Sequence, residues 1–493
     1  MSKLTSLSPR SGEPVGTVTT SSIDGVSGAV ERSRKAFRDW SDLSHRERRP
    51  YLKAYKRTVL ANMDHIAAVI RAETGKATGD AYVSDVLPAL NVMDFYARTT
   101  EKLLRPRRAP VWPYPMVRSR TVYRPRGVAA VIAPYNAPFF VAMLGAFPAI
   151  AAGCSVILKP SEFTPLTGAL VGDLAAEAGL PSDLVQVVQG DGTIGAALVG
   201  SGVDIVSFTG SPETGRLVLA AAAETLTPVI LELGGKDAMV VLDDADVAEA
   251  AKCAVWGATF LAGQVCISVE RVYVSQRIAA DFINAAEEAI DQLAIGMDDA
   301  RDIGPLIDPQ QAGIIERQVA DAVAKGAVIR RGGKRLMIDG GEYFQPTLLT
   351  GVDHSMEVMR TETFGPVVAI MEVTDEASAL RLADDCRYGL HGSVWSADKR
   401  RAAHLGSRMD SGTVAVNDHM INAFVPSIPS GGIKDSGFGL QLGPEGLRAF
   451  CHAKSITSPR LIATTRLLFG GRWMPRRVGP RYWRTLAKAM FRW

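Results

Sequence analysis

The chain has 493 residues, of which 47% are hydrophobic and 22% are charged, with 46 glycines. This length suffices for two or three domains and the composition is typical of a folded α/β protein, which excludes a single small binding module and a disordered or fibrous chain. The five cysteines are widely spaced, without a CxxC pair, which argues against a disulfide framework and a zinc site, so we expect no metal.

The amino-terminal segment MSKLTSLSPRSGEPVG is polar and turn-rich, whereas a signal peptide needs an apolar stretch. The sequence therefore predicts a cytoplasmic protein. The net charge of +3 is unevenly distributed, because the residues after Glu445 carry eleven Lys and Arg and no acid, which leaves −8 for residues 1–445. This asymmetry indicates that the basic tail, but not the acidic remainder of the chain, would bind an anionic surface.

Residues 121–211 alternate between short apolar runs and helical stretches. The predicted strands are GVAAVIAPY, CSVILKPS, LVQVVQG and VDIVSFTGS, and the predicted helices between them are AMLGAFPAIAAG and TGALVGDLAAEAG. Strands alternating with helices in this way are typical of βαβ units. This half of the chain is predicted to form a doubly wound parallel sheet.

A second alternation begins near residue 233. It contains the runs AMVVL, helical DVAEAAKCAVWGATFL, RVYVSQ, helical AADFINAAEEAIDQLAIG, VVAIMEV, ALRLADDCRYGL and GTVAVN. We interpret it as a second α/β domain. The sequence has no apolar run of eighteen residues that would span a bilayer.

Three residues in this frame have the chemistry of an acyl-transfer site. Cys266, in GQVCIS between a predicted helix and a predicted strand, is a candidate nucleophile, although a single cysteine is more often a buried small hydrophobe. Glu232 interrupts an apolar strand before a Gly-Gly turn, where poor solvation favours a general base; an exposed strand-end Glu is the alternative. Asn136, in APYNAPFF, is a candidate oxyanion donor or an ordinary turn residue.

Two glycine-containing windows follow predicted strands and are candidates for a dinucleotide site. GDGTIG at residues 190–195 fits GxGxxG but lacks a ribose-binding acid at the usual distance. FTGSPETG at residues 208–215 opens a helix with Ser211 and Pro212 at its start, so its free N–H groups suit a phosphate. We favour the second window.

Together these windows resemble the aldehyde dehydrogenase superfamily. The motifs APYNAP, KPSE, FTGSPETG, LELGGK, GQVC followed by Arg271, TFGPV, YGLHGSV and PSGGIKDSGFG occur in the family's order. The likeness runs from about residue 8 to about residue 457, more than nine-tenths of the chain.

The resemblance implies a role for each matching residue. Cys266 would be the nucleophile, Glu232 the base that activates the hydrolytic water, and Asn136 the amide of the oxyanion hole. The residues implied to bind NAD are Tyr135, Lys159, Glu162, Gly210, Ser211, Gly215, Leu233, Glu362 and Phe364. NAD is favoured over NADP because a carboxylate at Glu162 would accept hydrogen bonds from ribose hydroxyls but repel a 2′-phosphate, a preference that Lys159 would soften.

The same resemblance implies a fold and an assembly. We expect a Rossmann-type NAD-binding domain of residues 1–102 and 125–233, a second α/β catalytic domain of residues 234–425, and oligomerisation strands in residues 103–124 and 440–457. Residues 458–493 would be a basic amphipathic tail. The expected assembly is a homodimer or homotetramer, in which the stretch at residues 118–124 pairs with the strand at residues 451–457 of a neighbour.

The implied function is NAD-dependent oxidation of an aldehyde to a carboxylic acid through a thiohemiacetal and a thioester, with a hydrophobic or aromatic aldehyde as substrate. Two alternatives stay open within the resemblance: a CoA-acylating semialdehyde dehydrogenase and a catalytically silent relative. The first is disfavoured by Glu232, and the second by the intact set of Cys266, Asn136 and Glu232. A membrane-surface binding protein with vestigial activity is a further alternative.

Several positions depart from the family pattern. Leu261 stands where Asn is common, Thr361 replaces an acid, Ser430 replaces an aromatic residue, and Leu440 replaces Arg. These four positions leave the shape of the substrate pocket and the subunit packing open.

The tail beyond residue 458 departs further. In RYWRTLAKAMFRW the apolar side chains Trp483, Leu486, Met490 and Trp493 recur at helical spacing, opposite Arg481, Arg484, Lys488 and Arg492. Such a helix is too short to span a bilayer; it either lies on an anionic membrane or packs on the protein's own body or a partner subunit. Nucleic-acid binding is not expected, because the basic run has no accompanying motif.

Overall fold

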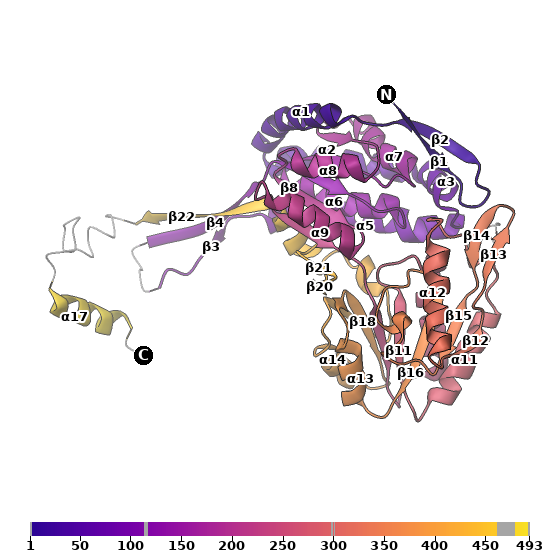
Figure 1. The fold of residues 1–493 in the computed structure, drawn as a ribbon. Coiled ribbons are helices and arrows are strands. Elements are labelled where there is room, and N and C mark those ends of the chain that lie inside the picture. Colours follow the sequence, from indigo (N-terminus) through magenta and orange to yellow (C-terminus); the bar gives the residue numbers. More distant parts are fainter. Residues whose placement is uncertain (1, 113–116, 297–298, 300, 461–478, 492–493) are drawn as a thin grey trace.

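Two open sheets flanked by helices form the body of the molecule, and a narrow three-stranded arm projects from it (Figure 1). The structure is a computed structural model that describes residues 2–112, 117–296, 299, 301–460 and 479–491. The amino-terminal part contains β1 (Lys3–Leu7), β2 (Pro14–Thr19), α1 (Ile23–Asp42), α2 (His45–Ala61), α3 (Met63–Thr74), α4 (Thr78–Ala81), a π-helical turn η1 (Tyr82–Val86) and α5 (Leu87–Leu103).

The first sheet has the strand order β21-β9-β8-β5-β6-β7. Its strands are β21 (Gly437–Phe438), β9 (Val229–Glu232), β8 (Ile205–Thr209), β5 (Val128–Ile132), β6 (Ser155–Lys159) and β7 (Val185–Val187), and its helices are α6 (Pro138–Ala152), α7 (Pro165–Glu177), α8 (Gly192–Gly200) and α9 (Pro212–Ala223). All pairs except β21–β9 are parallel. The doubly wound sheet predicted for this half is confirmed.

Both faces of this sheet are covered, which explains why its strands are continuously apolar. Along β5, Ala129 and Val131 belong to the core formed with α2, α5, α6 and α7, whereas Val128, Ala130 and Ile132 belong to the core formed with α1, α8 and α9. Every residue of β5 is therefore buried. The strand order of this buried sheet decides which of the loops at the strand ends are neighbours.

The second sheet has the order β12-β15-β16-β11-β10-β18-β19. Its strands are β12 (Val328–Arg331), β15 (Thr347–Thr350), β16 (Val367–Val373), β11 (Val269–Ser275), β10 (Asp237–Val241), β18 (His391–Trp395) and β19 (Thr413–Val416), and its helices are α10 (Val247–Thr259), α11 (Ala279–Asp291), α12 (Gln311–Ala324), α13 (Glu376–Asp384) and α14 (Lys399–Gly406). Only the β12–β15 pair is antiparallel. The predicted second α/β alternation is thus present.

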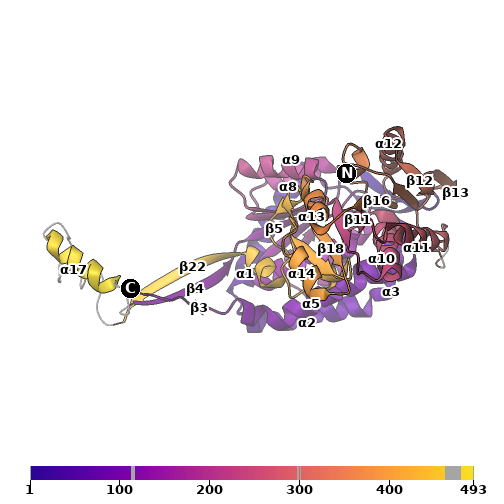
Figure 2. The same ribbon diagram turned by 90° about the horizontal axis from the view of Figure 1, so that it is seen from below.

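Shorter elements complete the body and the arm. They are the 3₁₀ turns η2 (Phe260–Gly263), η3 (Glu357–Met359) and η4 (Ile421–Phe424), the hairpin β13 (Arg335–Ile338) with β14 (Gly341–Phe344), the pair β17 (Tyr388–Gly389) with β20 (Ile433–Lys434), and α15 (Gly443–Ala449). The arm consists of β22 (Cys451–Pro459), β4 (Val117–Pro125) and β3 (Arg107–Arg108), all antiparallel. The segments at residues 118–124 and 451–457, which were expected to pair between neighbouring subunits, pair with each other within one chain. Figure 2 shows how far this arm extends from the body.

The helix predicted in the tail is present as α17 (Pro480–Met490), drawn beyond the end of the arm in Figures 1 and 2. Arg492 and Trp493, which the sequence pattern assigned to its two faces, lie outside the described residues. Within the part of the chain that is described, no helix is both long and apolar enough to cross a membrane.

The turn after α9 gives a first testable prediction. Leu226 has φ +54° and is 90% exposed, and the backbone N–H of Thr227 donates to Ala222 O at 3.0 Å, as in a helix ending that normally has glycine in the left-handed position. Leu226→Gly is expected to stabilise the protein by about 1 kcal/mol, a rise in Tm of roughly 1 to 2 °C. As the matched control, Leu219→Gly inside α9 should destabilise it by about 1 kcal/mol; equal shifts in thermal denaturation would contradict the argument.

Candidate active site

The carboxyl ends of four parallel strands bring the predicted residues to one edge of the first sheet. In the register, Ile132 lies between Lys159 and Phe208, and Thr209 lies opposite Glu232. β5 leads into the loop with Asn136, β6 ends at Lys159, β8 leads into Ser211, and β9 ends at Glu232. Because the strand order reverses between β5 and β8, this edge is a topological switch point, where open α/β sheets bind ligands.

The amino ends of the second sheet face this edge. The Gly234-Gly235 turn joins β9 directly to β10, and a Cβ atom on Gly235 would lie 2.3 Å from the Cys266 carbonyl oxygen. Asp237 at the start of β10 pairs with Val269 of β11, three residues after Cys266. The cysteine loop therefore packs directly against the turn that follows Glu232.

A left-handed turn positions Cys266. Leu261, Ala262 and Gly263 have φ values of +52°, +56° and +74°, so α10 ends at Thr259 and the predicted helix is wrong in continuing through residue 261. Leu261 is the position where the family commonly has Asn, a residue that tolerates this region of backbone space much better than Leu. The strain lies immediately before the nucleophile loop, as is common near functional sites.

Hydrogen bonds hold the loop on both sides of Cys266. The Gln264 side chain donates to Leu261 O at 3.0 Å and accepts from Ile307 N at 2.9 Å. After the cysteine, Ser268 Oγ donates to Gly257 O at 2.9 Å, and a ring nitrogen of His419 lies 3.0 Å from Ile267 O. Cys266 itself is half-buried. These hydrogen bonds fix the backbone on both sides of Cys266.

Asn136 lies beside this loop. Its Nδ2 donates to Gln264 O at 2.9 Å, two residues before Cys266, which leaves the second amide proton for a further acceptor. The backbone carbonyl oxygen of Asn136 accepts from Lys76 Nζ at 2.8 Å. Lys76 is in turn paired with Asp85 at 2.9 Å. Asp85 also accepts from the backbone N–H of Phe139 at 3.0 Å, at the start of α6. A buried ion pair from the amino-terminal helices thus holds the amide in place.

Glu232 is 8% exposed, and its Oε1 has no hydrogen-bond partner among the described residues. Burial raises the pKa of this carboxyl well above its usual value, because the charged form loses solvation without a compensating donor. A Cβ atom on Gly431 would lie 3.2 Å from Oε1, so the loop at residues 430–431 covers the carboxyl. A poorly solvated carboxylate with a raised pKa is suited to accept a proton near neutral pH.

The charges around Cys266 disfavour its thiolate. Burial raises the pKa of the thiol above its ordinary value, and the carboxylates of Glu362, Asp237 and Glu232 raise it further. The site therefore contains negative charge that a cationic group next to the sulfur would offset. This is the electrostatic setting expected of a cysteine that works beside a positively charged ligand ring.

The start of α9 forms a cradle next to Leu233. The Ser211 side chain accepts from Thr214 N at 3.2 Å, and a Cβ atom on Gly215 would lie 2.6 Å from a Leu233 methyl carbon. Gly210 N donates to Glu232 O at 3.1 Å, which fixes the loop to β9. The helix start is capped by a neutral hydroxyl and is open to an anion.

The alternative candidate for the dinucleotide site, residues 190–195, contains the start of α8. The residue that caps this helix is the acid Asp191, whereas Ser211 caps α9. The carboxylate of Asp191 accepts from Thr193 N at 2.9 Å at the start of α8. A phosphate would be repelled by this carboxylate, so the geometry favours the window at α9.

Lys159 and Glu162 lie next to the same edge. Lys159 is 4% exposed, its Nζ donates to Pro160 O at 2.9 Å and lies 3.6 Å from Glu162 Oε2. The Glu162 side chain is 42% exposed. A half-exposed carboxylate beside a buried ammonium offers both an acceptor and a donor to a polyhydroxylated ligand.

Glu362 contacts the Gly234-Gly235 turn, and the ring of Phe364 contacts that of Tyr135. Glu362 accepts from Gly235 N at 3.0 Å, and burial, with Glu270 nearby, raises the pKa of its carboxyl to about 8. Phe364 has φ +50°, and its ring meets that of Tyr135 edge-to-face at 6.2 Å between centroids. The structure places the residues predicted for catalysis and cofactor binding at the carboxyl ends of β5, β6, β8 and β9 and in the loops that contact the Gly234-Gly235 turn.

Sequence reasoning missed the buried charges that support these loops. Lys236 is paired with Glu270, and Glu270 accepts from the backbone N–H groups of Thr363 and Phe364 at 3.0 Å each. Both charged side chains are at most 3% exposed. The sequence did contain a signal for this buried pair. In KDAMVV and VERVYV a charged residue lies at the start of an apolar strand, where a solvated side chain is not expected.

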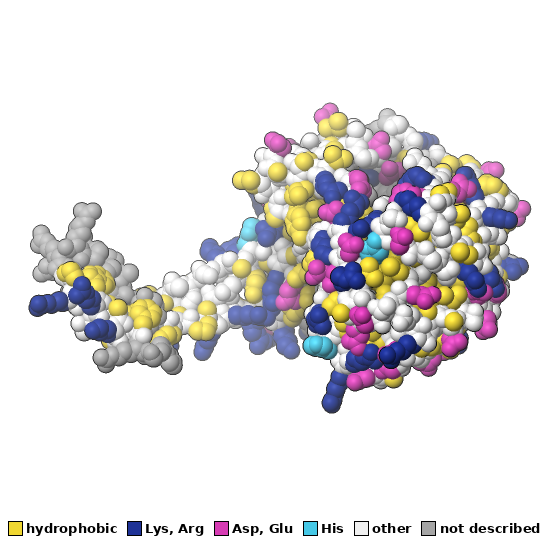
Figure 3. Space-filling model, turned by 60° about the horizontal axis from the view of Figure 1, so that its bottom comes forward, with side chains coloured by type: hydrophobic (Ala, Val, Ile, Leu, Met, Phe, Trp, Pro, Cys, Tyr) yellow, Lys and Arg dark blue, Asp and Glu magenta, His cyan; other side chains and the backbone are white. Residues whose placement is uncertain are grey.

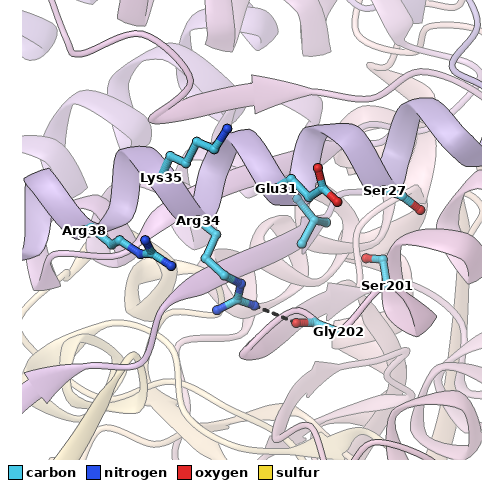
Figure 4. Close-up of a pocket in the computed structure, with 8 residues that line it drawn as sticks. Ser27, Glu31, Arg34, Lys35, Arg38, Ser201 and Gly202 are labelled. Carbon is cyan, nitrogen blue, oxygen red and sulfur yellow. Dashed lines mark hydrogen bonds between the residues drawn. The ribbon is translucent and has the colours of Figure 1, made fainter.

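A separate cavity of about 420 Å³ lies along α1 (Figure 4). Its lining includes Arg34, Lys35 and Arg38 but none of the predicted site residues. Arg34 donates to Gly202 O at 2.8 Å and pairs with Asp204 at 2.9 Å, which ties α1 to the start of β8. This arrangement is explained by packing and helix attachment.

Comparisons with known proteins agree with this geometry. Residues 2–456 match the model of the aldehyde dehydrogenase family. The chain is 39% identical to a 4,4′-diapolycopene aldehyde oxidase of Methylomonas sp, over 92% of this chain and 86% of that protein. It is 35% identical to a putative succinate-semialdehyde dehydrogenase [NADP(+)] of Mycolicibacterium smegmatis, over 92% and 88%.

Among solved structures, it is similar to a Mycobacterium tuberculosis aldehyde dehydrogenase complexed with NAD+, with a TM-score of 0.89, 32% identity, and coverage of 94% and 95% of the two chains. The predicted fold class is confirmed by this likeness. The chain belongs to the aldehyde dehydrogenase family.

Proposed function

We propose that this enzyme oxidises a hydrophobic or aromatic aldehyde to its carboxylic acid with NAD, through a thioester on Cys266. The observation that carries the proposal is the convergence of three residues at the facing strand ends: the half-buried Cys266, Asn136, whose amide donates to Gln264 O, and Glu232, whose Oε1 has no partner among the described residues. These are the parts that nucleophilic acyl transfer followed by hydrolysis requires.

The residues of the chain divide the chemistry between them. The Cys266 thiolate attacks the aldehyde carbon, and the oxyanion of the resulting thiohemiacetal receives hydrogen bonds from Asn136 Nδ2 and the Cys266 backbone N–H. When bound, NAD would supply a cationic ring that favours the thiolate and would take up the hydride from the former aldehyde carbon, which leaves a thioester on Cys266. Glu232 then takes a proton from water, and the hydroxide formed cleaves the thioester to release the acid and the free thiol.

The cradle fits a dinucleotide. The start of α9 at Gly210, Ser211 and Gly215 would hold the pyrophosphate, and Leu233 packs against Gly215 of this helix. Lys159 and Glu162 would hold the adenosine ribose, and the half-exposed Glu162 favours NAD over NADP. Glu362, Phe364 and Tyr135 would surround the nicotinamide end.

Apolar side chains around the site support a hydrophobic substrate. Leu440 lies within 3.0 Å of a Cβ position on Gly431, next to Glu232, and remains 38% exposed. Trp256 near the end of α10 is 43% exposed and its ring centroid lies 5.3 Å from that of Phe260, six residues before Cys266. The relative at 39% identity is named for a hydrophobic aldehyde.

The domain assignment and the assembly belong to the same proposal. Residues 1–102 and 125–233 would form the NAD-binding domain, residues 234–425 the catalytic domain, and residues 103–124 and 440–457 the strands through which a homodimer or homotetramer assembles. The exposed strand β22 and its partner β4 supply an edge for that contact. A cytoplasmic location is proposed for the assembled enzyme.

The function is tested with a panel of aldehydes graded by chain length and aromaticity, assayed for NADH or NADPH formation with and without CoA. We expect kcat/KM to rise with apolar size, NAD to be preferred, and the rate to be independent of CoA. A preference for succinic semialdehyde would overturn the substrate class, a requirement for CoA would indicate an acylating enzyme, and no turnover of any aldehyde would refute the activity.

Asn136→Ala is expected to lower kcat by about 10² to 10³, because one oxyanion donor is removed. Since the amide also donates to Gln264 O, the variant should be compared by thermal denaturation with the parent protein. If Asn136 were only a turn residue, kcat would change by no more than about twofold at unchanged aldehyde affinity.

A further inference from the structure

One face of the arm carries most of its cationic side chains, together with Val122 and Ile456. The register places Arg120 opposite Ile456 and Arg108, and Arg124 opposite His452, and residues opposite each other in an antiparallel pair point to the same side. With the alternation along each strand, this face carries Arg108, Arg118, Arg120, Arg124, His452 and Lys454. The arginines are exposed, and the described strands of the arm contain no acidic residue. Figure 3 shows dark blue side chains gathered along the arm.

The helix α17 is also cationic, but it has an apolar side as well. At helical spacing Trp483, Leu486 and Met490 share one side, while Arg481, Arg484 and Lys488 share the other. Trp483 is 36% exposed and the described part of the helix contains no acid. A helix with aromatic and aliphatic residues on one side and cations on the other is the form that lies in a membrane interface.

Charge is separated between these two elements and the body. The segments at residues 105–126 and 448–492 together carry +18, whereas the remainder of the chain carries −15, which gives the net +3. An anionic surface would attract the arm and tail and repel the body. The proposed oligomer contact uses the edge of β22, whereas such a surface would be met by the face of the arm that carries the arginines and by α17 (Figure 2).

From these observations we propose that the cationic face of the arm and the helix α17 together dock the enzyme on an anionic lipid bilayer. A bilayer satisfies both features, since its headgroups pair with the cations and its interface takes up the apolar side of α17. A nucleic acid would pair with the cations but has no apolar layer to take up Leu486 and Met490. The inference concerns binding alone, so it does not depend on which aldehyde is oxidised.

The test is co-sedimentation of the full chain with vesicles of phosphatidylcholine, with and without 30% phosphatidylglycerol, at physiological salt. We expect binding to the anionic vesicles at least about tenfold stronger than to the neutral ones, and release in 0.5 M NaCl. Each basic residue near the surface should contribute about fivefold, so the triple change Arg481→Gln, Arg484→Gln and Lys488→Gln should weaken binding by about 10². Leu486→Gln should weaken binding although it leaves the charge of the helix unchanged.

Two adjacent arginines supply a matched control for the arm. Arg108 lies on the cationic face opposite Arg120, whereas Arg107 lies opposite Thr121 on the other face. Arg108→Gln should weaken vesicle binding about fivefold, and Arg107→Gln less than twofold, because a sheet is about as thick as the Debye length of about 8 Å. Gel filtration and thermal denaturation should show an unchanged assembly and fold.

Equal binding to neutral and anionic vesicles, or no binding to either, would overturn the proposal. So would equal losses from Arg107→Gln and Arg108→Gln. If duplex DNA at equal phosphate concentration displaced the protein from vesicles, and Leu486→Gln had no effect, the surface would be a nucleic-acid site. These readouts need no turnover, so failure here is distinct from failure of the aldehyde activity.

Discussion

Cys266→Ala is expected to lower kcat/KM for every aldehyde by at least about 10⁴, because no other group in the site can form the covalent adduct. The thiol is half-buried between the left-handed turn and β11, so removal of its sulfur should leave the backbone unchanged. Steady-state NADH formation by the purified variant measures the loss.

A second cysteine provides the control for this prediction. Cys253 on α10 is also half-buried, but it is not among the groups that surround the site. Cys253→Ala should retain activity within about twofold. Comparable losses from both substitutions would mean that the effect of Cys266→Ala is structural.

Glu232→Gln is expected to separate the two halves of the reaction. The thiohemiacetal should still form and be oxidised, so one NADH per active site appears in a burst, while steady-state turnover falls by about 10² to 10⁴ because water is no longer deprotonated. Rapid mixing with the parent enzyme and the variant measures the burst and the slow phase. Loss of the burst itself would place Glu232 in the first half of the reaction instead.

The pH dependence follows from the raised pKa of Glu232. The base works only when ionised, so hydrolysis should rise with pH through a pKa above the usual value for Glu, and Glu232→Gln should lack this limb. The effect of the raised pKa on folding stability has the opposite sign. Because the pKa of Glu232 is higher in the folded than in the unfolded protein, the contribution of this carboxyl to the free energy of unfolding is fully present below its unfolded-state pKa. That contribution is lost as the pH rises through the folded-state pKa. Glu232→Gln should therefore raise Tm at neutral pH.

The sequence predicted those parts of the site that local pattern encodes. Glu232 was found because a carboxylate interrupts an apolar strand before two glycines, and Ser211 because it precedes Pro212 at a helix start. Strand ends in a parallel sheet meet at one edge, so predicting the alternation of strands and helices also predicts that these residues come together.

Other parts depend on contacts that no local pattern encodes. Lys76 reaches Asn136 across 60 residues of sequence, and its partner Asp85 reaches Phe139 across 54. Such a pair is recognisable only once α3, η1 and α6 are packed. The end of α10 was misplaced for a different reason: Leu261 and Ala262 take left-handed conformations that their side chains disfavour, so apolar periodicity alone extended the helix.

The central claim is that the acyl group of the substrate is carried by the Cys266 sulfur. Glu232→Gln is mixed with an aldehyde and NAD, quenched in acid, digested, and analysed by mass spectrometry. We predict a peptide containing Cys266 whose mass is raised by the acyl group, and its loss in the Glu232→Gln, Cys266→Ala double variant. Release of acid with no acylated Cys266 peptide, or acylation of another residue, would contradict the mechanism.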